Sequence, residues 1–254
     1  MKIYRPAEAV LSDAAADQPS ILLYTLWRSG THWLAEMLAD LTGLTGIYAS
    51  DDVTDYARET ASQLQQYRRN TILIRHLCTA PQVLLALTDS LDMRVILLYR
   101  DPRDVLASNV NMRKYREGYR ANLPPFPDMS IDAILDWELE HLGDIYRRLL
   151  PAWVAAEHPA LLKVRYEDLL TDTRAELRRV ANFVGRSPPE ERIAEIARTH
   201  DFQRKTARQP GEEDKRSHQR RGVIGDHRRQ FSAEQLRRIA EALGDAVRAL
   251  GYAT

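Results

Sequence analysis

The chain has 254 residues, of which 44% are hydrophobic and 28% charged, and its 36 Lys and Arg residues balance 36 Asp and Glu residues. This length can bury a sizeable core in one domain, and the balanced charge argues against a general attraction to nucleic acid or to a membrane. The only cysteine, Cys78, excludes an intrachain disulfide, and no apolar run resembles a signal peptide or a membrane span, so we expect a cytoplasmic protein.

Apolar runs of strand-forming residues alternate with amphipathic segments along the chain. Strands are predicted at 20–26, 70–77, 93–100 and 160–170, the last running into a turn or helix. Helices are predicted at 31–43, 81–88, 101–115, 131–150, 171–185, 189–199 and, capped by Ser232, at 232–250. Long loops are predicted at 116–130 and 206–230. This alternation indicates an α/β fold: a single-domain, three-layer sandwich with a central parallel sheet, similar to P-loop nucleotide-binding folds.

The first strand runs into Arg28, Ser29, Gly30 and Thr31, and a helical pattern follows at once. In such sheets, ligands bind beyond the carboxyl ends of the strands, where helix N-termini favour anions. Gly30 lets the backbone approach a ligand closely, and Arg28 supplies positive charge. The Walker pattern G-x-x-x-x-G-K-S/T is absent, which disfavours a kinase or NTPase loop. The alternative is a capped turn with a surface arginine.

Two further stretches could bind phosphate. Arg100 ends the third strand, where a charge is costly unless paired, and Ser108 follows two helical turns later. The alternative for Arg100 is an ion pair with Asp101 or Asp104. The segment 204–229 holds nine Lys or Arg residues against four Asp or Glu residues, and its alternative is a solvated charged loop.

Together these stretches resemble the sulfotransferases that use 3′-phosphoadenosine 5′-phosphosulfate (PAPS). "LWRSGTHW" is similar to their phosphosulfate loop, Y-P-K-S-G-T-T-W, and "YRDPRDVLAS" to their 3′-phosphate motif, R-N-P-K-D-V-x-x-S. "VRYEDLL" resembles their Y-E-D-L segment, and "RRGVIGDHRRQF" resembles R-K-G-x-x-G-D-W-K-x-x-F. The resemblance spans about residues 20–235. It implies a metal-independent enzyme that transfers the sulfuryl group of PAPS to a hydroxyl or amine of a small molecule or glycan.

The resemblance assigns the phosphosulfate end of PAPS to the first loop. Arg28 stands at the position of the family's lysine, which stabilises the leaving phosphate. Ser29, Gly30 and Thr31 match the phosphate cradle, and His32 replaces its second threonine.

Other matching positions are assigned to the nucleotide. Trp33, Tyr166 and, more distantly, Phe202 match residues at the adenine. Arg100 and Ser108 match the ligands of the 3′-phosphate, and so do Arg220, Arg221 and Gly222 of the later loop. His227 replaces the usual tryptophan and receives no role.

His76, in "LIRHL", matches the histidine that the family places after the second strand. An imidazole that titrates near neutral pH suits the removal of a proton from the acceptor, with in-line attack on sulfur. The expected catalytic residues are thus Arg28, His76 and Ser108. A structural histidine is the alternative.

The acceptor side is poorly specified by the sequence. Residues 44–67 and 112–130 are the variable stretches, and their vicinity offers Tyr115, Tyr119, Phe126 and Trp137, which core packing or surface exposure explains equally well. "RQPGEEDKRSH" resembles a loop of some bacterial members, which predicts a bacterial origin. Two other functions remain open: a P-loop nucleotide kinase or NTPase, and a non-catalytic nucleotide-binding protein of the same fold.

Overall fold

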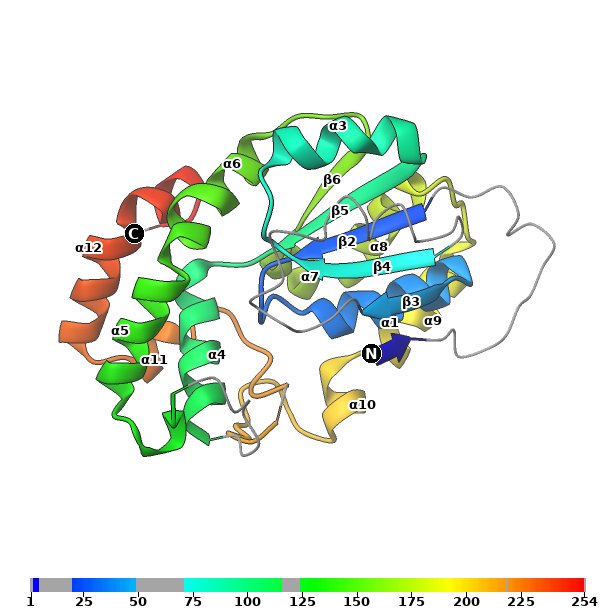
Figure 1. Cartoon of the computed structure of the whole chain (residues 1–254). Helices are drawn as coiled ribbons and strands as arrows, with labels where there is room; N and C mark the ends of the chain where they lie inside the picture. The colour runs from blue at the N-terminus through cyan, green and yellow to red at the C-terminus, as the bar shows by residue number, and fades with distance from the viewer. Residues whose placement is uncertain (1, 5–19, 49–70, 116–123, 218, 254) are drawn as a thin grey trace. The chain divides into compact units, whose positions relative to one another are not determined.

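The computed structural model describes residues 2–4, 20–48, 71–115, 124–217 and 219–253 (Figure 1). The chain divides into two compact units, Met1–Tyr99 with Ala152–Asp201 and Arg100–Pro151 with Phe202–Thr254. Each unit has its own elements and is described by itself. The single domain expected from the sequence stays a prediction.

The first unit contains a six-stranded sheet with the order β1-β3-β4-β2-β5-β6. Its strands are β1 (Lys2–Tyr4), β2 (Ser20–Thr25), β3 (Thr45–Tyr48), β4 (Thr71–His76), β5 (Met93–Tyr99) and β6 (Leu161–Arg165). Five of them, from β3 to β6, are parallel, and β1 adds an antiparallel edge. The predicted α/β fold with a central parallel sheet is confirmed, although β1 and β3 were not predicted from the sequence.

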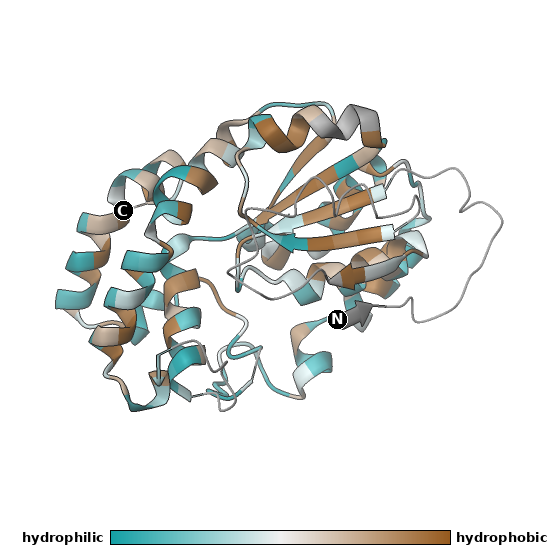
Figure 2. Ribbon diagram, viewed as in Figure 1, coloured by the Kyte–Doolittle hydropathy of each residue, from teal (hydrophilic) through white to brown (hydrophobic). Residues whose placement is uncertain are grey.

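The register of the central strands positions the site. All six residues of β2 are buried between β4 and β5, which explains the continuous apolar run (Figure 2). Thr25, the last residue of β2, pairs with His76 of β4 on one side and with Leu98 of β5 on the other. The ends of β2 and β4 therefore meet at one edge of the sheet, as expected for parallel strands.

Helices of the first unit bury their apolar sides against the sheet. They are α1 (Thr31–Thr42), α3 (Pro81–Leu91), α7 (Tyr166–Thr171), α8 (Thr173–Phe183) and α9 (Glu190–Thr199). Leu34 and Leu38 of α1 share one buried cluster with Ile21 and Leu23 of β2. α1 ends where Gly43 adopts a positive φ of 74°. At its other end, α1 begins at Thr31, directly after the loop that leaves β2.

The second unit is helical in the part that the structure describes. Its elements are α4 (Pro102–Tyr115), η2 (Phe126–Asp128), α5 (Ile131–His141), η3 (Ile145–Leu149), α10 (Phe202–Thr206), α11 (His227–Gln230) and α12 (Ala233–Ala249). Ser232 and Gln235 form a capping box at the start of α12, so the predicted cap is confirmed. The predicted loop 206–230 ends in the short helix α11.

The single helix predicted at 131–150 is wrong in detail. The structure places α5, the π-helical turn η3 and then α6 (Leu150–Ala155), which carries the chain from the second unit into the first. Pro151 has no backbone N–H, so the carbonyl of Arg147 lacks its α-helical donor, and the turn before the proline widens. No helix among the described residues is long and apolar enough to cross a membrane.

Candidate functional site

The loop between β2 and α1 buries a polar side chain at the start of a helix. The Oγ of Ser29 is buried and has no hydrogen-bond partner among the residues that the structure describes. The N-cap residue Gly30 supplies no side-chain cap, and the first turn of α1 holds no acidic residue. The backbone N–H groups of that turn and the positive end of the helix dipole can therefore receive an anion.

The backbone of this loop has an unusual conformation. Arg28 adopts a φ of 61° and Gly30 a φ of 90°, both in the left-handed region. A Cβ on Gly30 would lie 2.9 Å from Cδ2 of Tyr166, too close for any other residue. Left-handed strain at a residue with a side chain is typical of functional loops, and here it sets the direction in which Arg28 leaves the backbone.

Thr25 links this loop to His76. Its Oγ1 lies 2.7 Å from Oγ1 of Thr31 and 3.3 Å from Nδ1 of His76, and it donates to the carbonyl of Leu26 at 3.1 Å. The ring of Trp27 packs at 5.0 Å from the ring of His76. Thr25 was not among the residues predicted from the sequence, although it is a hydroxyl at the end of a buried apolar strand.

Burial determines the charge of His76. Loss of hydration, together with the charges of His32 and Arg75, lowers the pKa of His76 to about 3, against a hydrogen bond to the backbone of Thr25 that raises it. The expected titration near neutral pH is therefore wrong for the protein without ligand. The ring is neutral at pH 7, the form that can accept a proton.

Trp33 is held in a defined orientation on α1. Its Nε1–H donates to the carbonyl of His200 at 2.8 Å, and its ring meets that of Tyr166 edge to face, with 6.1 Å between centroids. His200 is itself paired with Asp40 of α1 through a 2.8 Å contact between Nε2 and Oδ2. Two of the three residues expected at the adenine thus contact one another, and His200, which was not predicted, anchors one of them.

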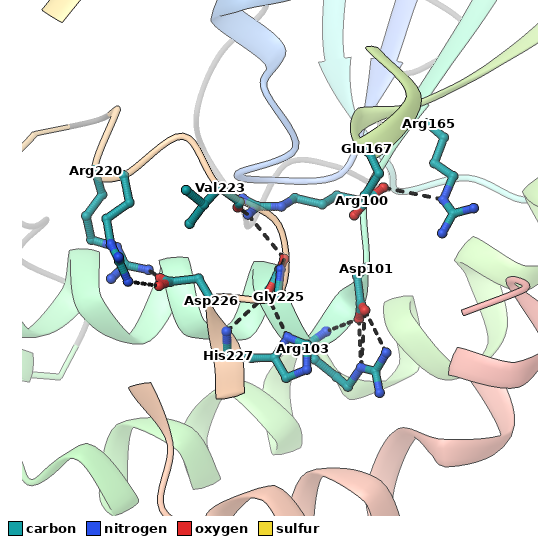
Figure 3. Close-up of polar contacts among 12 residues, drawn as sticks. Arg100, Asp101, Arg103, Arg165, Glu167, Arg220, Val223, Gly225, Asp226 and His227 are labelled. Atoms are coloured by element: carbon teal, nitrogen blue, oxygen red, sulfur yellow. Dashed lines mark hydrogen bonds and ion pairs between the residues drawn. The ribbon is translucent and has the colours of Figure 1, made fainter. Parts of the chain in front are cut away.

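In the second unit, Asp104 holds the loop that precedes α11. Figure 3 labels Val223, Gly225 and His227 of this part of the chain. The carboxylate of Asp104 accepts the backbone N–H of Gly225 at 2.8 Å and that of His227 at 3.0 Å. It also pairs with Nδ1 of His227 at 2.6 Å and with the guanidinium of Arg100 at 3.4 Å. Arg100 further donates to the carbonyl of Val223 at 3.0 Å. The ion pair weighed as the alternative for Arg100 is present.

The hydrogen bonds to Asp104 outweigh its burial. Burial would raise the pKa of Asp104, but the hydrogen bond from His227, the charge of Arg100 and the two backbone N–H groups lower it to about 2. This carboxylate therefore stays charged through the physiological range and binds the loop to the first turn of α4.

Arg220 and Arg221, the two loop arginines assigned to the 3′-phosphate, are also paired. The Nη1 of Arg220 lies 2.8 Å from Oε1 of Glu213, and both Arg220 and Arg221 bind the buried carboxylate of Asp226. A Cβ on Gly222 would lie 2.5 Å from Cδ2 of Phe202, so this glycine allows the loop to pack on that ring. The second unit therefore brings Phe202 together with Gly222.

The predicted residues divide between the two units. Those assigned to the phosphosulfate, together with His76, Trp33 and Tyr166, lie in the first unit. Arg100, Ser108, Phe202 and the loop residues 220–222 lie in the second. Ser108 is buried on α4. Asp104 was considered only as an alternative ion-pair partner of Arg100, and Asp226 was not singled out, so the role of both carboxylates in holding the loop was not predicted from the sequence.

Aromatic residues expected near the acceptor have structural roles in the second unit. The guanidinium of Arg113 lies 4.5 Å from the ring centroid of Phe126 and 4.3 Å from that of Trp137. Arg113 also binds the fully buried Glu138, and Phe126 is itself fully buried. Core packing therefore explains Phe126, while Tyr119 lies outside the described residues.

Comparisons with known proteins identify relatives over most of the chain. The sulfotransferase domain family matches residues 18–251. Sulfotransferase 1A1 of Rattus norvegicus is 24% identical over 217 residues, which cover 80% of this chain and 72% of the relative. The structure of mouse sulfotransferase SULT7A1 complexed with PAP matches with a TM-score of 0.68 and 21% identity, over 92% of this chain and 85% of that chain. The structure of retinol dehydratase in complex with androsterone and inactive cofactor PAP matches with a TM-score of 0.64 and 18% identity. The match covers 90% of this chain and 80% of that chain.

Proposed function

The chain belongs to the sulfotransferase domain family, and we propose that it transfers the sulfuryl group of PAPS to a hydroxyl or amine of a small-molecule or glycan acceptor. The observation that carries the proposal is the start of α1, which has no side-chain cap and where the buried Oγ of Ser29 has no partner within the described part of the chain. A buried polar group without a partner is costly, and a bound anion would relieve that cost. The loop therefore fits a phosphosulfate.

Each residue of the loop has a defined task in this proposal. Ser29 and the first backbone N–H groups of α1 hold the phosphosulfate, and Thr31 and His32 border it. Arg28 neutralises the charge that develops on the leaving phosphate. PAPS supplies an activated sulfuryl group, whose bond to the phosphate oxygen breaks as the acceptor oxygen or nitrogen bonds to sulfur. Catalysis is then mainly positioning and charge stabilisation.

His76 takes the acceptor's proton. Its neutral ring lies at the edge of the sheet where the loop begins, because Thr25 and His76 are paired in the register of β2 and β4. The electron pair of the broken S–O bond stays on the phosphate, and the proton of the acceptor moves to the imidazole. Negative charge bound at the loop would raise the pKa of His76 and favour this transfer.

We assign the 3′-phosphate to Arg100, Ser108, Arg220, Arg221 and Gly222, and the adenine to Trp33, Tyr166 and Phe202. Ser108 is included with Arg28 and His76 as a catalytic residue because it matches the family's motif. Two similar proteins of known structure are complexed with PAP, and one of them also holds androsterone, which supports a small-molecule acceptor. A cytoplasmic location and a bacterial origin stay predictions.

The first test needs no acceptor. Adenosine 3′,5′-bisphosphate is titrated into the protein by calorimetry, with ATP and 5′-AMP as controls. Selective binding of the bisphosphate is expected. A preference for ATP would favour the kinase or NTPase alternative, and no binding of any nucleotide would contradict the donor assignment.

The second test addresses the base. His76→Ala is expected to lower turnover of labelled PAPS by about 10²–10⁴-fold, the usual contribution of a general base, while binding of the bisphosphate stays within about threefold. Phenols, sugars and amines serve as candidate acceptors. Turnover at the wild-type rate in the variant would remove His76 as the base, and binding without turnover in the wild type would favour a non-catalytic protein.

A further inference from the structure

Thr25 Oγ1 has three polar neighbours in a closed environment. They are the carbonyl of Leu26 at 3.1 Å, Oγ1 of Thr31 at 2.7 Å and Nδ1 of His76 at 3.3 Å. Thr25 is fully buried, Thr31 is 6% exposed and His76 is 7% exposed. With so little access to water, the directions of these hydrogen bonds are set by the groups themselves.

Counting protons settles the direction at His76. A hydroxyl has one proton to donate and two lone pairs that accept, whereas a carbonyl only accepts. Because Thr25 donates its proton to Leu26, its two lone pairs receive the hydroxyl proton of Thr31 and a proton on Nδ1 of His76. This arrangement satisfies all three contacts at once.

The same result holds when an anion occupies the loop. If Thr31 turns its proton to the anion, Thr25 can move its own proton from the carbonyl of Leu26 to Oγ1 of Thr31, and one of its two lone pairs then still accepts from Nδ1. In both arrangements the proton of the neutral imidazole stays on Nδ1.

We propose that Thr25 is a positioning residue that holds His76 as the Nδ1–H tautomer and so leaves Nε2 as the nitrogen that takes the acceptor's proton. The tautomer of a histidine is set by the hydrogen bond of its other nitrogen. This inference rests on the proposed function for the role of Nε2, but the tautomer itself is a property of the protein alone.

The test uses nitrogen NMR of protein labelled with ¹⁵N in its histidine rings, with His76→Gln to assign the signals. Wild-type protein at pH 7 is expected to show a protonated, pyrrole-type Nδ1 and an unprotonated, pyridine-type Nε2 at His76. An Nε2–H tautomer in the wild type would overturn the proposal, whatever the activity.

Matched variants separate the tautomer from the fold. Thr25→Val keeps the β-branched shape but removes the hydroxyl, so both tautomers of His76 should be populated and kcat should fall about 10–100-fold with bisphosphate binding within about threefold. Thr25→Ser should restore the Nδ1–H signature and most of the rate. Thr31→Val, which removes the other partner of Thr25, should leave the tautomer unchanged. An unchanged tautomer and rate in Thr25→Val would contradict the assignment.

Failure of the proposed function gives a different result. If no acceptor is sulfated by the wild type but its His76 shows the Nδ1–H signature, which Thr25→Val loses, the sulfuryl-transfer proposal fails and the tautomer assignment stands. If sulfation occurs and the wild type carries the proton on Nε2, the reverse conclusion follows.

Discussion

Two helix starts in this protein share a sequence signal and differ in how their positive ends are satisfied. Arg28 lies just before α1, and Arg100 lies just before α4. At α1 no acidic residue stands in the first turn, and none of the described residues gives the buried Oγ of Ser29 a hydrogen bond. At α4 the carboxylate of Asp101 accepts the backbone N–H of Arg103 at 2.9 Å, and Asp104 occupies the first turn.

The difference shows that an arginine before a helix does not by itself make an anion site. The α4 start is complete with the chain's own carboxylates, and a phosphate there would have to share Arg100 with Asp104. The α1 start lacks such a carboxylate, so an external anion would gain the full benefit of its backbone N–H groups. We therefore expect mutation of Asp104 at the α4 start to act chiefly through stability, and mutation of the loop at the α1 start to act chiefly through binding.

The largest expected effect breaks the α4 start. Asp104→Ala leaves two backbone N–H groups and the charge of Arg100 without this buried carboxylate, and should lower the free energy of unfolding by about 3–5 kcal/mol. Urea denaturation measures the loss. The control is Glu234→Ala in the first turn of α12, where the carboxylate is exposed and a much smaller loss is expected. Equal losses in the two variants would contradict the structural role of Asp104.

A methyl group on the loop tests the α1 start. Gly30→Ala would place a Cβ 2.9 Å from the ring of Tyr166, in addition to the strain of a positive φ, and should weaken bisphosphate binding at least about tenfold. Gly185→Ala is the matched control, because its φ is 73° but nothing lies within 4 Å of the added Cβ. Calorimetry should find the control unchanged in affinity, and a comparable weakening in both would point to general strain.

Two hydroxyls of the same loop should respond in opposite ways. Ser29→Ala removes a buried group without a partner, so stability should stay equal or rise by up to about 1 kcal/mol, while bisphosphate affinity falls about 5–10-fold. Thr31→Val removes the hydrogen bond to Thr25 and should lower stability by about 1 kcal/mol. Thermal unfolding with and without bisphosphate separates the two cases. Loss of stability in Ser29→Ala without loss of affinity would count against the anion site.

The smallest expected effect is a difference in how His76 and Asp104 make the free energy of unfolding depend on pH. The pKa of His76 is lowered to about 3, so between pH 6.5 and 3 the unfolded chain binds the extra proton, and stability falls as pH falls through this window. From pH 7 to 5.5 the loss should be about 1 kcal/mol, and His76→Gln should lack this part. The contribution of Asp104, whose pKa is about 2, persists above pH 4 and is lost only as pH falls toward 2. Equal losses in wild type and His76→Gln over this range would refute the buried neutral histidine.

Much of the fold was predictable because its signals are local. The strand at 20–26, the helix at 31–43 and the cap at Ser232 depend on residues close in sequence. The helix at 131–150 failed because its apolar period continues through Leu142, whereas α5 ends at His141 and the chain then forms the π-helical turn Ile145–Leu149. β3 was missed because its four residues, Thr45–Tyr48, show no clear period and gain their partners from β4 and β1.

The sequence alone determined the order of the motifs, the α/β class and the positions of Arg28, His76 and Arg100, because each depends on residue type and local spacing. Only the tertiary structure decided which of these groups have partners. Thr25 and His76 are 51 residues apart and meet through strand register. Asp104 and His227 are 123 residues apart, and their contact determines the charge at the start of α4. Such pairings depend on how distant segments pack, and local patterns of residue types do not specify which distant segments come into contact.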